Sequence, residues 1–225
     1  MKKRVLAIVI ALAVVLLGAT AFVVRKNILD GQRCDQVQAD ISSRGEVVTV
    51  GSGPLKVAVL GDSYTAGDLM DNYRDGWAYK MPAALSATVS VAGVGSTGFT
   101  AGGPCGDQSY PERVKTAVRT NPDVLLIQGG LNDSDSDPNM VGAKADFVLR
   151  QAGAIKRVIV IGPVSAPAKS NLAAIDQQLA AAAKLNKREY VSALDWNLEF
   201  LPDRVHLTPA GHAEFARRVA AAVNP

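Results

Sequence analysis

Four short, mostly apolar segments constrain the fold of this 225-residue chain more than any other feature. They cover residues 57–60, 88–92, 124–127 and 158–161, and a glycine closely follows each one. Helical segments are expected after them, at residues 77–85, 111–119, 141–152 and 172–185. Strands that are apolar along their length and alternate with helices are typical of a parallel sheet covered on both faces. We therefore predict an α/β domain.

Shorter segments complete this expected order of elements. Residues 46–50 can form a strand before the first apolar segment, and Tyr190 begins a short fifth strand after the last one. Thr208 is a favoured helix N-cap and proline suits the next position, so a final helix is predicted from there to about Ala221. These elements place the domain at residues 46–225.

The composition agrees with one domain and argues against a nucleic-acid partner. Hydrophobic residues make up 48% of the chain, enough for a sizeable core, and a chain of this length ordinarily forms one domain. The formal charge is +3, but residues 1–26 carry five cations and no acid. Removing those five charges leaves −2 for residues 27–225. Nucleic-acid binding needs a basic face, and this remainder has none.

The first 26 residues predict a signal peptide or an N-terminal transmembrane anchor. A basic start, residues 2–4, precedes an uncharged stretch from Val5 to Val24, and two cations follow. About 20 apolar residues match the hydrocarbon core of a bilayer. Residues 19–21 resemble a signal-peptidase site, whereas the apolar run continuing to Val24 favours an uncleaved anchor. With either alternative, the domain is expected outside the cytoplasm, at the cell membrane or secreted.

Two cysteines support the same compartment. Cys34 lies in residues 27–45, a polar segment without periodicity that we interpret as a linker or stalk. Cys105 lies in a glycine-rich loop. Outside the cytoplasm such a pair tends to be oxidised, so we predict a disulfide between them. Two cysteines and two late histidines do not have the spacing of a zinc site, and we expect neither a metal nor a cofactor.

Polar residues follow several predicted strands directly. Asp62 and Ser63 follow the first apolar segment, a Gly/Ser/Thr turn follows the second, and Asn132 comes after the third. Asp203 and His206 follow the last strand. The carboxyl ends of parallel strands meet at one edge of the sheet, where α/β domains bind ligands. We therefore expect these side chains to lie close together.

Ser63, His206 and Asp203 form a candidate catalytic triad. With two histidines in the chain, the general base is His206 or His212. Asp203 can bond Nδ1 of His206 and leave Nε2 free to accept a serine proton. We expect His212 to pack or hydrogen-bond at the start of the last helix, and Asp195 is a weaker alternative to Asp203.

The serine on its own has two interpretations. Ser63 could be a helix N-cap as readily as a nucleophile. A nucleophile also needs donors for the oxyanion, and the backbone N–H of Ser63, a glycine N–H after the second strand and the Asn132 amide are available. We expect Asp62 and Asp133 to hold their turns through bonds to backbone N–H groups.

Four sequence blocks in this order resemble the motifs of the SGNH/GDSL hydrolase family, in its membrane-anchored or secreted bacterial form. The blocks are residues 61–67 (GDSYTAG), 93–98 (GVGSTG), 130–133 (GLND) and 203–212 (DRVHLTPAGH). The resemblance spans about residues 55–222. Two departures stand out: Gly93 occupies the place of an asparagine in the second block, and Tyr64 replaces the leucine of the family's name.

The resemblance implies a fold and a site. The fold would be a three-layer α/β/α flavodoxin-like sandwich around a central parallel sheet of about five strands. The site would combine Ser63, His206 and Asp203 with an oxyanion hole made by the N–H groups of Ser63 and of a second-block glycine, and by Asn132. We favour Gly98 as that glycine, with Gly95 as the alternative.

The functional hypothesis is an extracytoplasmic serine esterase that acts through an acyl-enzyme on Ser63. Its expected substrate is a small-molecule or carbohydrate ester of a short acyl group, such as O-acetyl. An acyltransferase with the same centre is an alternative, and a catalytically silent SGNH-like binding domain of the cell envelope is another. The intact candidate residues argue against a silent domain. We expect a monomer that contacts a membrane only through its N-terminal segment.

Overall fold

A mostly parallel sheet organises the computed structural model, which describes residues 2–153 and 155–224, with side chains except those of residues 2–11 and 14. Within these residues the sheet has six strands, in the order β1-β3-β2-β4-β5-β6. Their bounds are β1 Val48–Val50, β2 Leu55–Gly61, β3 Ala87–Gly93, β4 Val124–Gln128, β5 Arg157–Val164 and β6 Glu189–Ala193. Every pairing is parallel except that of β1, which runs antiparallel to β3 at one edge.

The strand order confirms the predicted fold class. Counted along the chain, the five parallel strands lie in the order 2-1-3-4-5, which is the flavodoxin-like arrangement. In such a sheet the second parallel strand, β3, lies on one side of β2, and the third, β4, lies on the other. A crevice forms at this switch point, beyond the carboxyl ends of β2 and β4. The sixth strand, β1, adds an antiparallel edge to the expected five.

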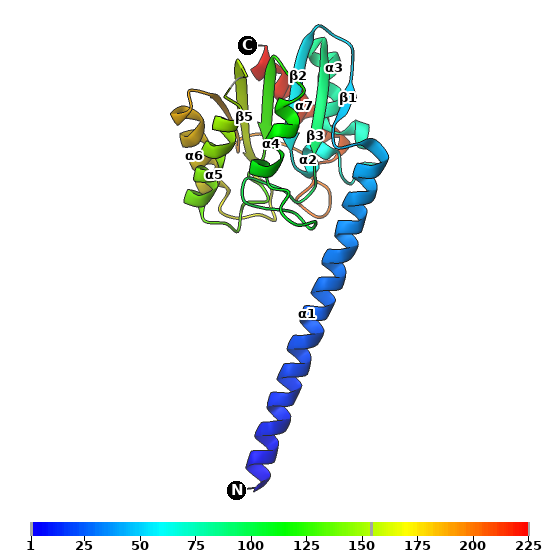
Figure 1. The fold of residues 1–225 in the computed structure, drawn as a ribbon, viewed down its shortest axis with the longest axis vertical. Coiled ribbons are helices and arrows are strands. Elements are labelled where there is room, and N and C mark those ends of the chain that lie inside the picture. Colours follow the sequence, from blue (N-terminus) through cyan, green and yellow to red (C-terminus); the bar gives the residue numbers. More distant parts are fainter. Residues whose placement is uncertain (1, 154, 225) are drawn as a thin grey trace.

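Helices cover both faces of the sheet (Figure 1). Their bounds are α1 Lys2–Arg44, α2 Ser63–Ala66, α3 Trp77–Leu85, α4 Tyr110–Val118, α5 Pro138–Gln151, α6 Leu172–Leu185 and α7 Pro209–Val223, with a 3₁₀ turn at Tyr73–Asp75. Alternate residues of β2 divide the core. Val57 and Val59 pack with α3 and α7, whereas Ala58 and Leu60 pack with α4, α5 and α6.

Capping residues decide where the helices begin. Thr208 accepts a bond from the N–H of Gly211 and starts α7 at Pro209, as the sequence predicts. Helix α5 begins three residues before the predicted Val141, because Asp137 accepts a bond from the N–H of Asn139 and proline occupies the first helical position. A cap of this kind contributes about 1 kcal/mol to stability.

Helix α1 extends far beyond the sheet (Figure 1). It includes the segment that we expected to be a stalk without periodicity, and ends at Arg44 before Gly45, whose φ is 86°. From residue 30 onward one stripe of the helix is half-buried, at Asp30, Cys34, Val37, Ile41 and Arg44. This spacing of four and three residues places the stripe on the side of the helix that packs against the domain.

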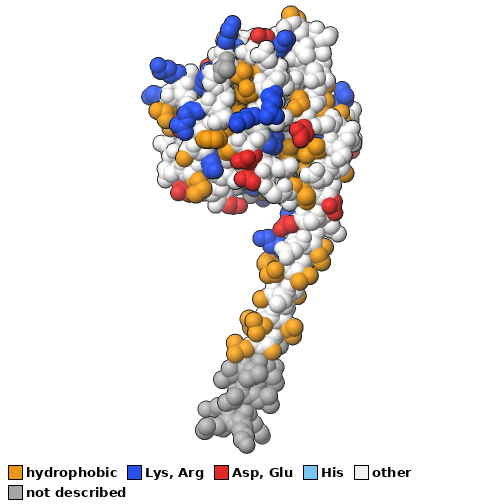
Figure 2. Space-filling view, in the orientation of Figure 1, with side chains coloured by type: hydrophobic (Ala, Val, Ile, Leu, Met, Phe, Trp, Pro, Cys, Tyr) orange, Lys and Arg blue, Asp and Glu red, His pale blue; other side chains and the backbone are white. Residues whose placement is uncertain are grey.

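The N-terminal half of α1 stands clear of the domain. Figure 2 shows apolar side chains exposed along it, in the stretch between Leu12 and Leu29. Where side chains are described, no helix has an apolar stretch long enough to cross a membrane. The predicted signal peptide or anchor at residues 1–26 depends in part on residue 1 and on the side chains of residues 2–11 and 14, which lie outside the described residues.

Candidate active site

Ser63 lies at the tight turn between β2 and α2. Asp62, not Ser63, is the N-cap of α2, because its Oδ1 accepts a bond from the Tyr64 N–H at 2.9 Å. Ser63 is therefore the first helical residue, and its side chain is not used as the cap. Gly61 makes the turn possible, since a Cβ there would lie 2.0 Å from Oγ1 of Thr65. The cap interpretation of Ser63 is excluded.

Asp203 and His206 form the predicted pair. Nδ1 of His206 lies 2.6 Å from Oδ2 of Asp203. The other carboxylate oxygen accepts bonds from the backbone N–H groups of Val205 and His206, both at 2.9 Å. Partial desolvation raises the pKa of Asp203, but these three hydrogen bonds outweigh it and hold that pKa below its ordinary value. The carboxylate stays charged and orients the imidazole.

One cleft of about 500 Å³ brings the candidate nucleophile and the candidate base together. Ser63 and His206 both line it, although only 6% of Ser63 is exposed. Its other lining residues are Arg33, Gln36, Val37, Asp40, Asp68, Leu69, Gly95, Ser96 and Pro104. The volume is in the range of small-molecule sites. The sheet edge therefore gathers side chains that are 143 positions apart in the sequence.

The surroundings of the two second-block glycines bear on which of them can donate to the oxyanion. The N–H of Gly98 donates to the Ala101 carbonyl at 2.8 Å, so this group is already used within its turn. Gly95 instead lines the cleft, and a Cβ on it would lie 3.9 Å from Cβ of Ser63. The geometry favours Gly95, our alternative, over Gly98 as the oxyanion donor, and the oxyanion hole itself stays a prediction.

Asn132 and Asp133 hold the same turn from the end of β4. Nδ2 of Asn132 donates to the Thr97 carbonyl at 2.9 Å, and the second hydrogen of this amide remains for another acceptor. The Asp133 carboxylate accepts bonds from the N–H groups of Phe99, Thr100 and Ala101, at 3.0, 2.7 and 3.1 Å. The expectation that Asp133 holds a turn is confirmed.

Asp62 also holds its turn, as predicted, and does so while completely buried. Nε2 of Gln128 donates to its Oδ2 at 3.1 Å, and Oε1 of Gln128 accepts a bond from Oγ1 of Thr65 at 2.9 Å. Burial raises the pKa of Asp62 to about 7, despite the bonds from Tyr64 and Gln128 that lower it.

Sequence reasoning did not foresee how two residues join the parts of the site. The hydroxyl of Tyr64 donates to the carbonyl of Val205, directly before His206, and so links the nucleophile helix to the histidine loop. Arg113 of α4 donates to the carbonyls of Gly61 and Ala92, at 3.0 and 3.2 Å, and to Oγ1 of Thr97, at 2.7 Å. Both bind mainly backbone carbonyls, which leave no mark in a sequence.

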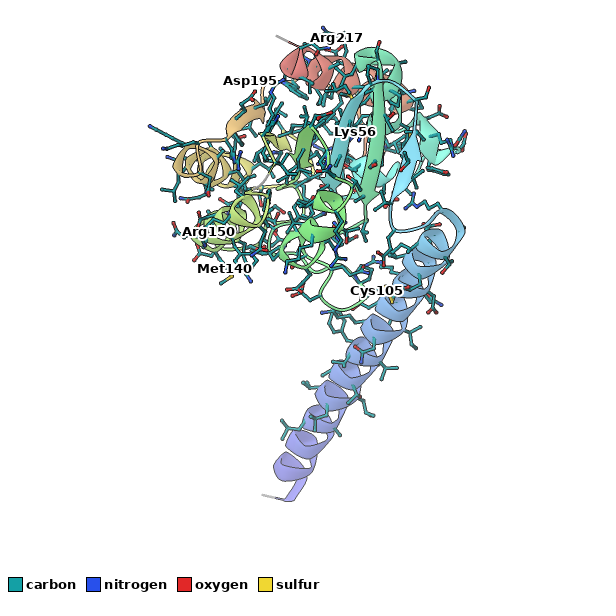
Figure 3. All side chains as sticks on the ribbon, turned by 45° about the horizontal axis from the view of Figure 1, so that its top comes forward. Lys56, Cys105, Met140, Arg150, Asp195 and Arg217 are labelled. Carbon is teal, nitrogen blue, oxygen red and sulfur yellow. A yellow bond between two sulfur atoms is a disulfide. The ribbon has the colours of Figure 1, made fainter. Side chains whose placement is uncertain are left out.

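The rival histidine and aspartate have other roles. His212 is buried and accepts a bond from the N–H of Trp77 at 3.3 Å, as expected for a packing residue at the start of α7. Desolvation lowers the pKa of His212 to about 4, so it is neutral at ordinary pH. Pro104 lines the cleft, so its neighbour Cys105 marks the position of the cleft in Figure 3. Asp195 is exposed and lies on the opposite side of the molecule in that view. Asp203 is thus the partner of His206.

The predicted disulfide is confirmed. Cys34 of α1 and Cys105 are bonded, with their Cα atoms 4.8 Å apart. Figure 3 shows Cys105 against the upper part of α1. The bond fixes α1 to the loop between β3 and α4.

Comparison with known proteins gives a consistent result for the domain. The model of the GDSL-like lipase/acylhydrolase family matches residues 59–214. No protein with a curated description matches the sequence. Among solved structures, a carbohydrate acetylesterase from Sinorhizobium meliloti, Est24, superposes with a TM-score of 0.66 at 17% identity, covering 76% of this chain and 98% of the other.

Two further solved structures are similar. The aryl esterase of M. smegmatis superposes with a TM-score of 0.63 at 16% identity, and a putative arylesterase from Agrobacterium tumefaciens with 0.63 at 18% identity. Each superposition covers 76% of this chain and 98% of the similar chain. At these identities the likeness establishes the shared fold.

Proposed function

Because this chain belongs to the GDSL-like lipase/acylhydrolase family and is a carboxylic ester hydrolase, we propose that it hydrolyses esters of short acyl groups, such as acetyl, on carbohydrate alcohols. The observation that carries the proposal is the cleft in which Ser63 and a His206 already oriented by Asp203 lie together. Seven of the eleven residues that line this cleft have polar side chains, which supports a polar alcohol. The acetylesterase activity of the similar Est24 supports the same substrate class.

The reaction follows from these residues in two steps. Oγ of Ser63 attacks the ester carbonyl while Nε2 of His206 accepts its proton, and Asp203 stabilises the resulting imidazolium. The N–H groups of Ser63 and Gly95 and the Asn132 amide bind the oxyanion. As the tetrahedral intermediate collapses, the ester C–O bond breaks and the imidazolium protonates the departing alcohol. A water, deprotonated by His206, then attacks the acyl-enzyme and releases the carboxylic acid and free Ser63.

The direct test is turnover of p-nitrophenyl acetate by the full chain and by Ser63→Ala. Loss of the nucleophile is expected to lower kcat by about 10⁴- to 10⁶-fold, as in other triad hydrolases. Ser96→Ala is the matched control, because Ser96 lines the same cleft and is expected to keep activity within a few-fold. Equal rates for Ser63→Ala and the unmodified chain would refute the nucleophile. Product analysis with an added glycan acceptor separates hydrolysis from acyl transfer.

We also propose that the domain works outside the cytoplasm. The Cys34–Cys105 disulfide supports this location, because such bonds persist in oxidising compartments. A fluorophosphonate probe that cannot cross membranes is expected to label Ser63 in intact cells that make the protein. Labelling that requires cell lysis would contradict the location and leave the esterase proposal untouched.

A further inference from the structure

The side of α1 nearest the domain forms one wall of the catalytic cleft. Four of its residues line the cleft that also holds Ser63 and His206: Arg33, Gln36, Val37 and Asp40. Arg33 also lines an adjoining hollow with Ser96, Gly103 and Pro104. The residues matched by the family model begin at 59, so this wall lies outside the matched part of the chain.

Two attachments, ten residues apart, hold the wall in place. At one end the disulfide joins Cys34 to Cys105, which Figure 3 shows against α1. At the other end Nη1 of Arg44 donates to the Ala66 carbonyl at 2.9 Å, and its guanidinium lies 5.4 Å from the ring centroid of Tyr73. Gln36, Val37 and Asp40 lie between these points, so they face the cleft on an anchored segment of helix.

The lining of this part of the cleft suits hydroxyl groups. Gln36 offers an amide, Asp40 and Asp68 offer carboxylates, Ser96 offers a hydroxyl and Arg33 offers a guanidinium. Neighbouring hydroxyls both donate and accept, so they can satisfy such a mixed set. A long alkyl chain in the same place would offer these groups no hydrogen-bond partner.

We propose that Gln36 and Asp40 of α1, with Arg33 at the mouth, form a subsite for the polyhydroxyl alcohol portion of the ester, such as a sugar. The subsite rests on the proposed esterase function and adds the residues that select the alcohol. The acyl group faces Ser63, and the alcohol extends along α1. The disulfide fixes the wall and thereby maintains the selectivity.

The test compares two esters of the same acid in the full chain: 6-O-acetylglucose, with a sugar alcohol, and p-nitrophenyl acetate, without one. Asp40→Asn and Gln36→Ala are each expected to lower kcat/KM for 6-O-acetylglucose about threefold to tenfold, as the loss of one hydrogen bond predicts. Turnover of p-nitrophenyl acetate is expected to stay within twofold.

Matched controls come from the same helix. Asp35→Asn and Gln38→Ala make the same chemical changes at exposed positions that do not line the cleft, and should leave both rates unchanged. If the wall variants behave like these controls, or lose both activities equally, the subsite is refuted. A chain that cleaves p-nitrophenyl acetate but not 6-O-acetylglucose also refutes it. A chain that cleaves neither ester instead refutes the proposed function.

The double variant Cys34→Ser, Cys105→Ser tests the anchoring separately. Release of α1 is expected to lower kcat/KM for 6-O-acetylglucose at least as much as Asp40→Asn does, while p-nitrophenyl acetate turnover reports that the domain is still folded. Unchanged selectivity between the two esters in the double variant would overturn the role of the disulfide.

Discussion

Tyr64 shows how much of the candidate site depends on a single hydroxyl. Its ring is buried against Phe215, with centroids 6.2 Å apart and the planes nearly perpendicular. Its hydroxyl donates to the carbonyl of Val205, and the next residue is His206, the candidate base. The residue after the nucleophile therefore also positions the histidine loop. A leucine at this place, as in the family's name, could fill the space but could not form the bond.

Tyr64→Phe is expected to lower kcat for p-nitrophenyl acetate about threefold to tenfold and to reduce the free energy of unfolding by about 1 kcal/mol. The ring packing stays, while the Val205 carbonyl loses its donor and His206 is less well fixed. Steady-state kinetics and urea unfolding measure the two effects. Tyr79→Phe is the control, because the Tyr79 hydroxyl makes only a 3.5 Å contact with the Ala66 carbonyl. If both variants behave alike, Tyr64 does not position the loop.

The candidate catalytic residues could be chosen from the sequence more readily than their hydrogen-bond partners. Ser63, Asp203 and His206 could be chosen from the sequence because few side-chain types perform these steps. The choice between Gly95 and Gly98 could not be made in this way. Both are glycines, and only the folded turn shows that the Gly98 N–H is already bonded to Ala101. The contacts of Tyr64 were hidden for a similar reason, since any residue offers a carbonyl.

At the scale of elements, α4 stabilises the edge of the sheet where the site forms. Arg113 reaches from this helix to the last residue of β2, to β3 at Ala92 and to Thr97 in the following turn. Thr97 in turn accepts the Asn132 amide through its carbonyl. One guanidinium thus joins the strand that precedes Ser63 to the turn that carries the proposed oxyanion donor.

Arg113→Met is expected to lower the free energy of unfolding by about 2–4 kcal/mol, because three carbonyls, including that of Gln108, and a hydroxyl lose a charged donor. It should also reduce kcat more than it changes KM, since the oxyanion donors shift while the cleft walls remain. Arg119→Met is the control at an exposed position just after α4. Arg113→Lys should restore part of the loss. A variant with normal kcat and reduced stability would limit Arg113 to a purely structural role.

Element boundaries were predictable where capping residues mark them, as at Thr208. The helical nature of residues 27–44 was not. The half-buried stripe of α1 contains aspartate, cysteine, valine, isoleucine and arginine, so burial there has no matching periodicity in hydrophobicity. The stripe is defined by contacts with loops far away in the sequence. Regular elements with apolar faces can therefore be predicted from local sequence, whereas a polar packed helix cannot.

For the whole molecule, two buried ionisable groups oppose each other in the pH dependence of stability. The pKa of Asp62 is raised from 3.8 to about 7, so between these values the folded state binds more protons than the unfolded state and stability falls as pH rises. The pKa of His212 is lowered from 6.5 to about 4, so in that window the unfolded state binds more protons and stability rises with pH. Burial also raises the pKa of Asp68, to about 6, so Asp68 acts in the same direction as Asp62.

Asp62→Asn is expected to remove the part of the fall in stability with rising pH that comes from Asp62. The free energy of unfolding of the variant, relative to the unmodified chain, should increase between pH 4 and pH 7 by up to about 1.4 kcal/mol per pH unit. Urea unfolding at pH 5, 6, 7 and 8 measures this difference. Asp135→Asn, at an exposed loop position, should show no such trend. An unchanged pH slope in Asp62→Asn would mean that Asp62 is ionised throughout this range.

The contribution of α1 to the cleft has an evolutionary consequence. At Gly61 and Gly93 an added methyl group would collide with neighbouring atoms, so the sheet edge tolerates little variation. Arg33, Gln36 and Asp40 are exposed on a helix, where most substitutions change stability by less than about 0.5 kcal/mol. Reaction chemistry and alcohol preference would then lie on parts of the chain that mutate independently. A lineage could acquire a new substrate by changing the helix while keeping an unaltered catalytic domain.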